Sequence, residues 1–393
     1  MTIITPTLNQ APFIEATIRS VVSQGYANLQ YLVIDGGSTD GTVDILKRYD
    51  PWITSWVSEV DHGQSHAINK GLALADGEFV AWLNSDDMYL PGAMTEAIRV
   101  LSQDAGAAMV YGSAYGLDVN GAPVWQFPAA RFDPVRTLFR NPIPQPAAFM
   151  RTEAIRAAGG LDESLHLMND VELWLRLARQ GALRSHSSRW AGVRLHREAK
   201  TLRCQDDLWA ENLRVTAALL EDPAWSAERT AVRRAVGYAH WYASMTCYRL
   251  GDVAGARKHV AEATVFCPEG PRTARFAQRA LLILALTGWY LDGTDSARAE
   301  VAVVEGYFEL FGDALPAKRR ALRMIRAALR ALRALDLRRG RALRIGDALL
   351  CLMSSPAFLI GMGVRNWQAL LARALASPLP ARLSPLRPRS LPG

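Results

Sequence analysis

Short β-branched runs alternate with amphipathic helical patterns over residues 1–115, and this alternation constrains the fold more than any other feature of the sequence. The segments TIITPT, QYLVIDGG and EFVAWLN are apolar runs that end in turn residues, which is typical of buried strands. Between them, residues 12–25, 42–49 and 65–75 place apolar side chains at helical spacing, and Gly25 closes the first of these helices. Strand–helix alternation predicts an α/β fold with a mostly parallel central sheet flanked by helices.

Helical patterns dominate the rest of the chain. Residues 162–182 predict an amphipathic helix that begins at a capping aspartate, Asp162. Residues 240–271 predict two helices joined at Gly251, which resemble one tetratricopeptide unit; no second copy follows, so a generic helical hairpin is the preferred interpretation. The sequence therefore predicts three regions, which are an α/β domain at 1–215, a helical hairpin region at 216–317, and a C-terminal segment at 318–393.

The net charge of +7 is concentrated near the C-terminus. Residues 318–393 hold sixteen Lys and Arg against two Asp, so residues 1–317 carry a net charge of −7. Residues 318–344 predict a basic amphipathic helix suited to an anionic membrane surface, with a solvated helix packed on the protein as the alternative. Aromatic side chains for base stacking are missing there, which disfavours nucleic acid. Residues 345–364 are apolar but broken by Asp347, Pro356 and glycines, so they make a poor spanning helix.

Cysteine usage and the first residues indicate the compartment. Cys204, Cys247, Cys267 and Cys351 lie far apart and match no metal-ligand spacing, which favours reduced thiols. The chain starts with a predicted strand rather than a signal peptide. A cytoplasmic location is therefore expected, with peripheral contact at the inner face of the membrane if the basic helix binds lipid.

Two adjacent carboxylates, Asp86 and Asp87, follow the apolar strand EFVAWLN. Neighbouring acids repel each other unless they share a cation or are screened by solvent. The carboxyl edge of an open α/β sheet is where ligands bind. Hard oxygen ligands that leave coordination positions open suit Mg²⁺ or Mn²⁺ holding a diphosphate. A solvated turn is the alternative explanation of these two residues.

Residues 1–203 resemble the inverting family-2 glycosyltransferases of the GT-A fold. The matching segments occur in the order ITPTLN, QYLVIDGGSTDGT, SEVDHGQSHAINKGLALADGEFVAWLNSDD, QPAAFMRTEAIRAAGGLDESLHLMNDVELWLRLA and HREAKT. The resemblance implies transfer of a sugar from a nucleotide-sugar donor, with a UDP-sugar preferred, to a hydroxyl of a glycan or lipid-linked acceptor. Cell-surface polysaccharide biosynthesis is the expected setting.

The resemblance also assigns residues to the nucleotide. The residues expected to contact the base, ribose or phosphates are Thr5, Pro6, Asn9, Asp35, Asp61, Lys70 and Asp86. Asp35 has a turn-capping role as its alternative, and Lys70 has a role as an ordinary surface lysine.

The resemblance places the metal at NSDD, with Asp87 and Asp86 as ligands of Mn²⁺ or Mg²⁺ and His196 approaching the metal or the diphosphate. Asn84 and Ser85 precede the acids, so fewer carboxylates are available than in a strict Asp-x-Asp motif.

Asp170 is the expected catalytic base. Glu172 follows two positions later and so faces roughly 200° away on a helix. The resemblance further suggests Arg197 and Lys200 near the departing phosphates, and Gln145 with Pro146 on the acceptor side.

Two other classes of protein remain open from the sequence. A nucleotidyltransferase also uses an α/β nucleotide site with metal-binding acids, but ITPTLNQAPF lacks the Gly-rich, Lys/Arg-containing loop that usually opens such a domain. A non-catalytic nucleotide-sugar-binding or scaffold protein acting through the C-terminal helices is the second alternative, although such a protein would not need both NSDD and MNDVELW.

Overall fold

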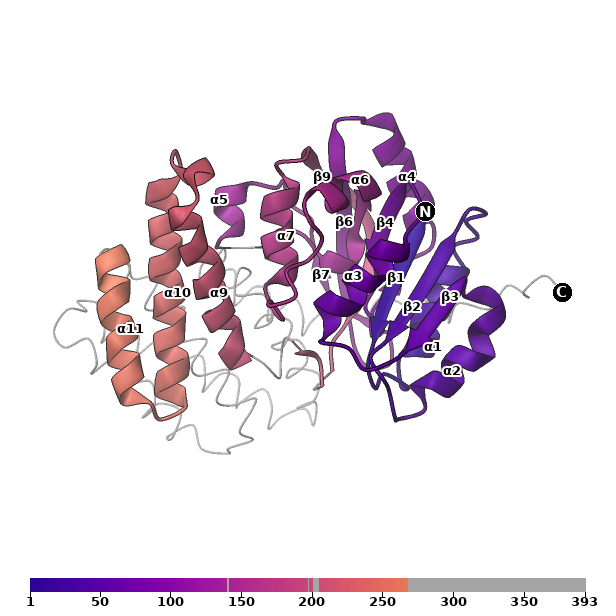
Figure 1. Ribbon diagram of the computed structural model, residues 1–393, viewed down its shortest axis with the longest axis horizontal. Coiled ribbons are helices and arrows are strands. Elements are labelled where there is room, and N and C mark those ends of the chain that lie inside the picture. The colour runs from indigo at the N-terminus through magenta and orange to yellow at the C-terminus, as the bar shows by residue number, and fades with distance from the viewer. Residues whose placement is uncertain (140, 197, 201–204, 268–393) are drawn as a thin grey trace, which may run out of the picture.

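The computed structural model describes residues 1–139, 141–196, 198–200 and 205–267 (Figure 1). The predicted basic helix and the segments beyond it lie outside the described residues. The strands are β1 (Thr2–Thr7), β2 (Gln30–Asp35), β3 (Ser55–Ser58), β4 (Phe79–Trp82), β5 (Met88–Tyr89), β6 (Ala107–Leu117), β7 (Pro123–Phe127), β8 (Ala148–Arg151) and β9 (Ala182–Arg194). The helices are α1 (Ile14–Val22), α2 (Thr42–Tyr49), α3 (Gln64–Leu74), α4 (Ala93–Gln103), α5 (Pro134–Thr137), α6 (Thr152–Ala157), α7 (Asn169–Leu177), α9 (Gln205–Glu221), α10 (Arg229–Arg249) and α11 (Val253–Phe266), with 3₁₀ turns at Asp50–Trp52, Gln145–Ala147 and Pro223–Trp225.

One mixed sheet forms the centre of the molecule, with strand order β3-β2-β1-β4-β8-β6-β9-β5 and β7 paired to β6. The first four strands in this order are parallel to one another. Beyond β4, strand β8 is antiparallel to both β4 and β6, whereas β6 and β9 are parallel. Because β1, β2 and β4 run in the same direction, the residues that follow them gather at one edge of the sheet.

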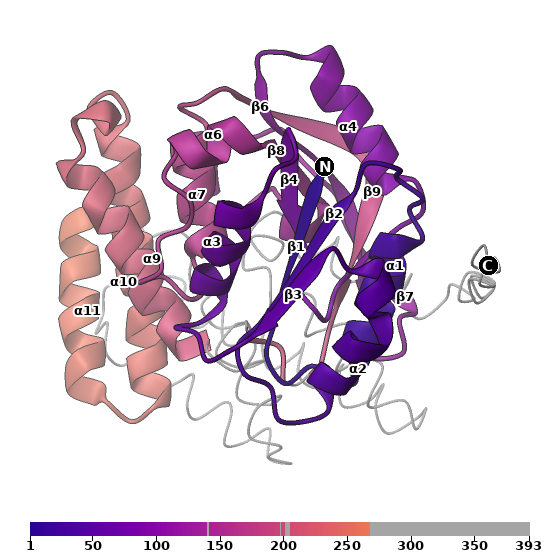
Figure 2. The ribbon, with the colours of Figure 1, turned by 45° about the vertical axis from the view of Figure 1, so that its right-hand side comes forward.

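Helices cover both faces of the sheet (Figure 2). On one face, α1, α2 and α4 bury an apolar cluster that includes Ile18, Leu46 and Met94. On the other face, α3, α6 and α7 bury a second cluster that includes Ile68 and Trp174. The sheet is therefore an interior layer between two helical layers, the arrangement that the strand–helix alternation predicts.

The expected strands and helices of the first 90 residues are confirmed. The prediction for residues 162–168 was wrong, because α7 begins only at Asn169 and Asp162 instead accepts from the backbone amide of Ser164 in a turn. Three backbone N–H groups that precede α7 donate to the carboxylate of Glu211 at 2.7–3.0 Å. These bonds from α9 hold the loop before α7, and no pattern within residues 162–182 could indicate them.

In the segment expected to form a helical hairpin, the structure has the helices α10 and α11. Helices α10 and α11 are joined at Gly251, whose φ of +83° requires glycine, and Asp252 caps α11 by accepting from the amide of Gly255. The expected domain boundary at residue 215 falls inside α9, so the helical region begins with α9. Trp225 and Val232 pack against Leu138 and Leu175 of the α/β layer. Among the described helices, none combines the length and apolar character that crossing a membrane requires.

Candidate active site

A cavity of about 990 Å³ opens at the carboxyl edge of the parallel strands and extends to helices α9 and α10. Its wall contains Pro6 after β1, the two acids after β4, and Asp170 at the start of α7. The structure therefore brings together, on one cavity, three of the carboxylates that the sequence singled out: Asp86, Asp87 and Asp170.

Asp87 is almost completely buried, with 4% of its surface exposed. Its Oδ1 accepts from the backbone amide of Arg194 at 3.0 Å, and its Oδ2 accepts from Asn84 Nδ2 at 3.3 Å. Burial, and then the charge of Asp86, raise the pKa of the Asp87 carboxyl well above its ordinary range. A site that crowds two carboxylates in this way favours a proton or a cation between them.

Asp86 is the more exposed member of the pair, and His196 lies against it. His196 Nε2 is 3.0 Å from Asp86 Oδ2, and the histidine side chain is 5% exposed. The imidazole also packs on the ring of Phe13, with 4.6 Å between ring centroids. Residue 196 is thus fixed beside the carboxylate pair, as a neighbour that can donate to Asp86 or share an ion with it.

Asp170 occupies the first turn of α7 and faces the cavity. Its Oδ1 accepts from the backbone amide of Val171 at 2.7 Å, and its Oδ2 accepts from Asn141 Nδ2 at 3.1 Å. Burial raises the pKa of the Asp170 carboxyl to about 6. Its proton affinity is therefore close to what a general base needs near neutral pH.

Glu172 has a different role. Its carboxylate forms an ion pair with Arg176 one turn later in α7, at 2.5 Å, and it is absent from the cavity wall. Arg176 in turn donates to the carbonyl of Ala158. The pair ties α7 to the end of α6, which leaves Asp170 as the carboxylate of this helix that faces the cavity.

Three of the residues expected at the nucleotide lie on the cavity wall: Pro6, Asp61 and Asp86. The carboxylate of Asp61 lies directly over Gly36, where a Cβ would come within 3.0 Å of Asp61 Oδ2. Gly63 donates its backbone amide to Asp61 Oδ1 at 2.8 Å. The absence of a side chain at Gly36 thus gives Asp61 its position at the end of β2.

Four residues expected at the nucleotide lie off the cavity wall: Thr5, Asn9, Asp35 and Lys70. Asp35 is fully buried, and its Oδ2 accepts from Ser58 Oγ at 2.6 Å and from the amide of Ser38 at 2.9 Å. This is the turn-capping role that the sequence left as the alternative.

Thr5, Asn9 and Lys70 each have a structural partner. The hydroxyl of Thr5 lies 3.2 Å from the hydroxyl of buried Tyr31. Asn9 has a φ of +52° and accepts from the amide of Thr39 at 2.9 Å, which joins the loops after β1 and β2. Lys70 forms an ion pair with Glu59.

The sequence did not reveal the polar residues that hold the acids in place. Asn84 accepts from Gln64 Nε2 at 2.6 Å and donates to Gln145 Oε1 at 3.1 Å, so a chain of amides lines the cavity beside Asp87. Buried Arg194 donates through Nε to the carbonyl of Asp86 at 3.0 Å. An arginine at the end of a strand carries no recognisable signal in a single sequence.

The resemblance suggested two cationic residues near the phosphates, and one of them lies among the described residues. Lys200 lies on the cavity wall, with its Nζ 3.5 Å from Gln64 Oε1. Arg197 lies outside the described residues. Gln145 and Pro146, expected on the acceptor side, both line the cavity.

Several aromatic side chains line the cavity where it meets helices α9 and α10. Trp209 of α9 and Tyr242 of α10 stack with 3.9 Å between ring centroids, and Tyr238 meets Phe139 edge to face at 5.5 Å. All four line the cavity, as does Trp125 of β7. The helices that follow the α/β layer therefore contribute directly to the site.

Comparisons with known proteins agree with this geometry. Residues 2–155 match the family model of glycosyl transferase family 2. An uncharacterized glycosyltransferase of Mycobacterium tuberculosis is 29% identical over 184 residues, which cover 45% of this chain and 68% of that protein. The putative teichuronic acid biosynthesis glycosyltransferase TuaG of Bacillus subtilis is 32% identical over 130 residues, covering 32% of this chain and 51% of TuaG.

The fold also has solved counterparts. The crystal structure of S. aureus TarS 1–349 in complex with UDP-GlcNAc aligns with a TM-score of 0.55 at 17% identity, over 81% of this chain and 91% of that chain. At this identity the likeness concerns the fold, which is of the GT-A type.

Proposed function

Residues 2–155 match the family model of glycosyl transferase family 2, and from that match we propose that the chain is a glycosyltransferase of this family, which transfers a sugar from a nucleotide-diphosphate donor to a hydroxyl of a glycan or lipid-linked acceptor. The transfer is a single displacement that inverts the anomeric carbon. A UDP-sugar is the preferred donor, in keeping with the UDP-GlcNAc complex of TarS. Cell-surface polysaccharide synthesis is the proposed setting, in keeping with the name of TuaG.

The donor end of the cavity is the carboxyl edge of β1 and β4. Pro6, Thr7 and Asp61 line this end of the cavity. In the proposed complex Pro6 and Thr7 would border the base, and Asp61 would accept a hydrogen bond from the base or ribose. Asp86 and Asp87 would hold a divalent cation, with His196 beside them. The donor set fits Mn²⁺ or Mg²⁺, because two crowded carboxylates supply hard oxygen ligands and the buried one is short of compensating charge. A bound cation supplies positive charge against the diphosphate leaving group.

Asp170 is the proposed general base. Its carboxylate takes the proton of the acceptor hydroxyl as that oxygen attacks the anomeric carbon. Asn141 holds Oδ2 and the Val171 amide holds Oδ1, so the carboxylate is oriented before the acceptor arrives. Orientation of this kind avoids reorganisation during the reaction.

The aromatic part of the cavity is the proposed acceptor wall. Trp125, Trp209 and Tyr238 present flat apolar faces with polar edges, which suits the alternating C–H and O–H surfaces of sugar rings. The wall extends from β7 across to α9 and α10, so it spans a larger surface than one sugar residue needs. An oligomeric glycan is therefore the preferred acceptor.

One observation carries the proposal: a crowded carboxylate pair and a separate carboxylate with a pKa of about 6 face the same cavity. A nucleotide-sugar-binding protein without catalysis needs the first feature alone. The second feature is what a displacement requires.

A donor screen tests the proposal. Thermal shift of the full-length protein with UDP-, GDP- and dTDP-sugars, with Mn²⁺ and again with excess chelator, should show one metal-dependent donor class. Incubation of that donor with an oligosaccharide acceptor pool should yield a product whose anomeric configuration, read by NMR, is opposite to that of the donor. Binding without any transfer would favour the non-catalytic alternative, and retention of configuration would exclude the displacement.

We also propose peripheral membrane contact through residues 318–344, on the basis of the sequence alone. Flotation of the full-length protein with vesicles should depend on anionic lipid and weaken when Arg323, Arg326 and Arg330 are changed to Glu. Equal flotation with neutral vesicles would contradict an electrostatic contact.

A further inference from the structure

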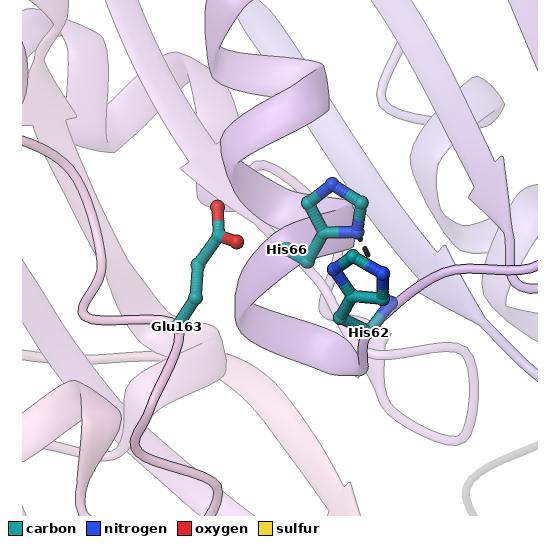
Figure 3. Close-up of side chains that lie close together, drawn as sticks. All are labelled: His62, His66 and Glu163. Atoms are coloured by element: carbon teal, nitrogen blue, oxygen red, sulfur yellow. Dashed lines mark hydrogen bonds between the residues drawn. The ribbon is translucent and has the colours of Figure 1, made fainter.

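Two histidines and a glutamate lie close together (Figure 3), and none of them lines the cavity. His62 lies just before α3, His66 lies in its first turn, and Glu163 lies in the loop that leads to α7. One ligand atom from each residue lies within 4.8 Å of the other two. Neither the donor site nor the proposed base uses these residues.

The backbone before α3 brings the two histidines together. Gly63 has a φ of +112°, which allows the chain to turn sharply between His62 and the first residue of the helix. The backbone amide of His62 donates to His66 Nδ1 at 3.1 Å. The two rings stack with 4.8 Å between centroids and 17° between planes. Both imidazoles are thus held on the same side of the helix start.

Glu163 is held in place by α3 itself. Asn69 Nδ2 donates to Glu163 Oε1 at 2.9 Å and also to the carbonyl of Leu161 at 2.9 Å. The amide of Leu161 donates back to Asn69 Oδ1 at 2.9 Å. These three hydrogen bonds fix the loop at the same helix that carries His66.

A second set of hydrogen bonds joins α3 to the loop before α7, one turn earlier in the helix. We call this contact between α3 and the loop the seam. Ser65 Oγ donates to the carbonyl of Leu165 and accepts from Asn169 Nδ2, both at 2.9 Å. The three candidate ligands therefore project from two segments, nearly a hundred residues apart in sequence, that are already joined. Sites built on fixed elements hold ions more tightly than sites on loose loops.

We propose that His62, His66 and Glu163 form a second divalent-ion site, selective for Zn²⁺ and similar imidazole-preferring ions, with water completing the coordination. Two imidazoles and one carboxylate are a zinc donor set, whereas Mg²⁺ and Mn²⁺ prefer the oxygen-rich carboxylate pair at Asp86 and Asp87. The two proposed metal sites thus prefer different ions, because their ligand atoms differ.

The present spacing needs a modest adjustment to close around an ion. Ligand atoms at zinc distances of ~2.0–2.2 Å stand about 3.3 Å apart in a tetrahedron. His62 and Glu163 are exposed, so their side chains can move inward by the required distance. A neutral imidazole has one unprotonated nitrogen, so coordination by His66 exchanges its hydrogen bond with the His62 amide for a metal bond.

The location gives the ion a consequence for the enzyme. The residues just after His62 include Gly63 and Gln64, which line the cavity and contact Asp61 and Asn84. The loop that carries Glu163 continues to Asp170. An ion at this seam would link the start of α3, on the donor side of the cavity, to the loop that leads to Asp170. Binding of the ion would therefore stabilise the relative positions of these two segments.

Calorimetric titration of chelator-treated full-length protein with Zn²⁺ tests the site, at a pH above the ordinary histidine pKa of ~6.5. We expect one zinc site whose affinity falls by at least ~10-fold in His66→Ala and in Glu163→Gln. Glu153→Gln removes the same charge from an exposed position on α6 and should leave the affinity unchanged. Co²⁺ in place of Zn²⁺ should give the visible spectrum of a four-coordinate ion.

Failure of this site is distinguishable from failure of the glycosyltransferase site. Asp87→Asn should abolish Mn²⁺-dependent donor binding and leave zinc binding intact. Zinc affinity that is unchanged in His66→Ala and His62→Ala, or equalled by Mg²⁺, would overturn the proposal and indicate adventitious surface binding.

Discussion

At the scale of a single residue, Asp170 is both accessible to ligands from the cavity and buried enough to have a raised pKa. It faces a cavity open to ligands, yet burial raises the pKa of its carboxyl to about 6. A carboxylate in that environment costs folding free energy whenever it is ionised, and such costs are common at catalytic positions. The consequences for rate and for stability have opposite signs, and both can be measured.

Asp170→Asn should lower kcat by roughly 10²–10⁴ and leave the donor dissociation constant nearly unchanged. The amide keeps the size of the side chain but cannot take a proton from the acceptor hydroxyl. Steady-state kinetics with donor titration separate the two quantities. Glu172→Gln is the matched control, because Glu172 pairs with Arg176 away from the cavity, and it should keep most of the activity. Undiminished transfer by Asp170→Asn would show that another group removes the proton.

The stability difference between Asp170→Asn and the wild type should depend on pH. The folded pKa of about 6 lies above the ordinary 3.8, so the folded state binds the proton more tightly than the unfolded chain. The stabilisation that this protonated carboxyl gives is complete below pH 3.8 and is lost as pH rises through 6. The free energy of unfolding of the variant should therefore increase relative to that of the wild type as the pH rises, by up to about 3 kcal/mol. Denaturant unfolding at acidic and neutral pH measures this gain, and a constant difference would contradict the raised pKa.

At the scale of elements, close approach of α3 to the sheet sets the position of the cavity wall. A Cβ at Gly71 would come within 2.5 Å of Ile4 Cγ2 on β1. The helix can pack this near only because residue 71 has no side chain. Gln64, at the start of the same helix, thereby reaches Asn84 beside the acids.

Gly71→Ala should destabilise the fold. Alanine is favoured over glycine inside a helix by roughly 0.5–1 kcal/mol. Overpacking against β1 costs about 1–3 kcal/mol and outweighs that gain. Gly106→Ala is the control, because the nearest atom to its Cβ is an exposed Asp104 oxygen at 3.4 Å. Thermal unfolding should show a lower Tm for the first variant alone, and a raised Tm in Gly71→Ala would mean that α3 lies further from the sheet.

The elements that the sequence predicted are those whose own pattern decides their structure. Strands β1, β2 and β4 and helices α1, α2 and α3 are apolar runs or amphipathic repeats bounded by turn residues. Strand β9 was missed because SHSSR within it is polar, and its pairing with β6 depends on residues far away in sequence. Local pattern cannot report a long-range pairing.

The candidate site divides in the same way. The pair Asp86 and Asp87 was singled out because two adjacent acids follow a strand and because the resemblance to family-2 glycosyltransferases implies a metal at NSDD. The arrangement of Asp61 over Gly36 and the role of Asn141 at Asp170 could not be found, since each joins segments that only the folded chain brings together. Asp35 was assigned to the nucleotide from its motif position, and the structure shows in addition that its Oδ2 accepts from Ser38 and Ser58 in the turn after β2.

At the scale of the whole molecule, helices α9 and α10 lie beside α7 (Figure 1), and residues of both helices line the cavity. Glu211 of α9 holds the loop before α7, and Trp225 packs against Leu138 and Leu175. Trp209 completes the cavity wall. The helical region therefore holds the loop that leads to Asp170, and it also forms the proposed acceptor wall of the cavity.

Trp225→Ala should cost about 3–5 kcal/mol, because a buried aromatic side chain is removed from the contact between the helices and the α/β layer. Acceptor KM should rise, whereas the donor dissociation constant should change little. Trp52→Ala, at a position 41% exposed, is the control and should cost about 1 kcal/mol or less. If both variants bound acceptor equally well, the helical wall would have no part in acceptor recognition.

The metal and the base can be tested together by diffraction from crystals soaked with Mn²⁺ and the donor identified in the screen, recorded at the manganese absorption edge. We expect an anomalous peak between Asp86 and Asp87 in contact with the diphosphate, with the carboxylate of Asp170 facing the sugar's anomeric carbon. A peak elsewhere on the protein, or a donor bound with Asp170 directed away from the sugar, would contradict this expectation.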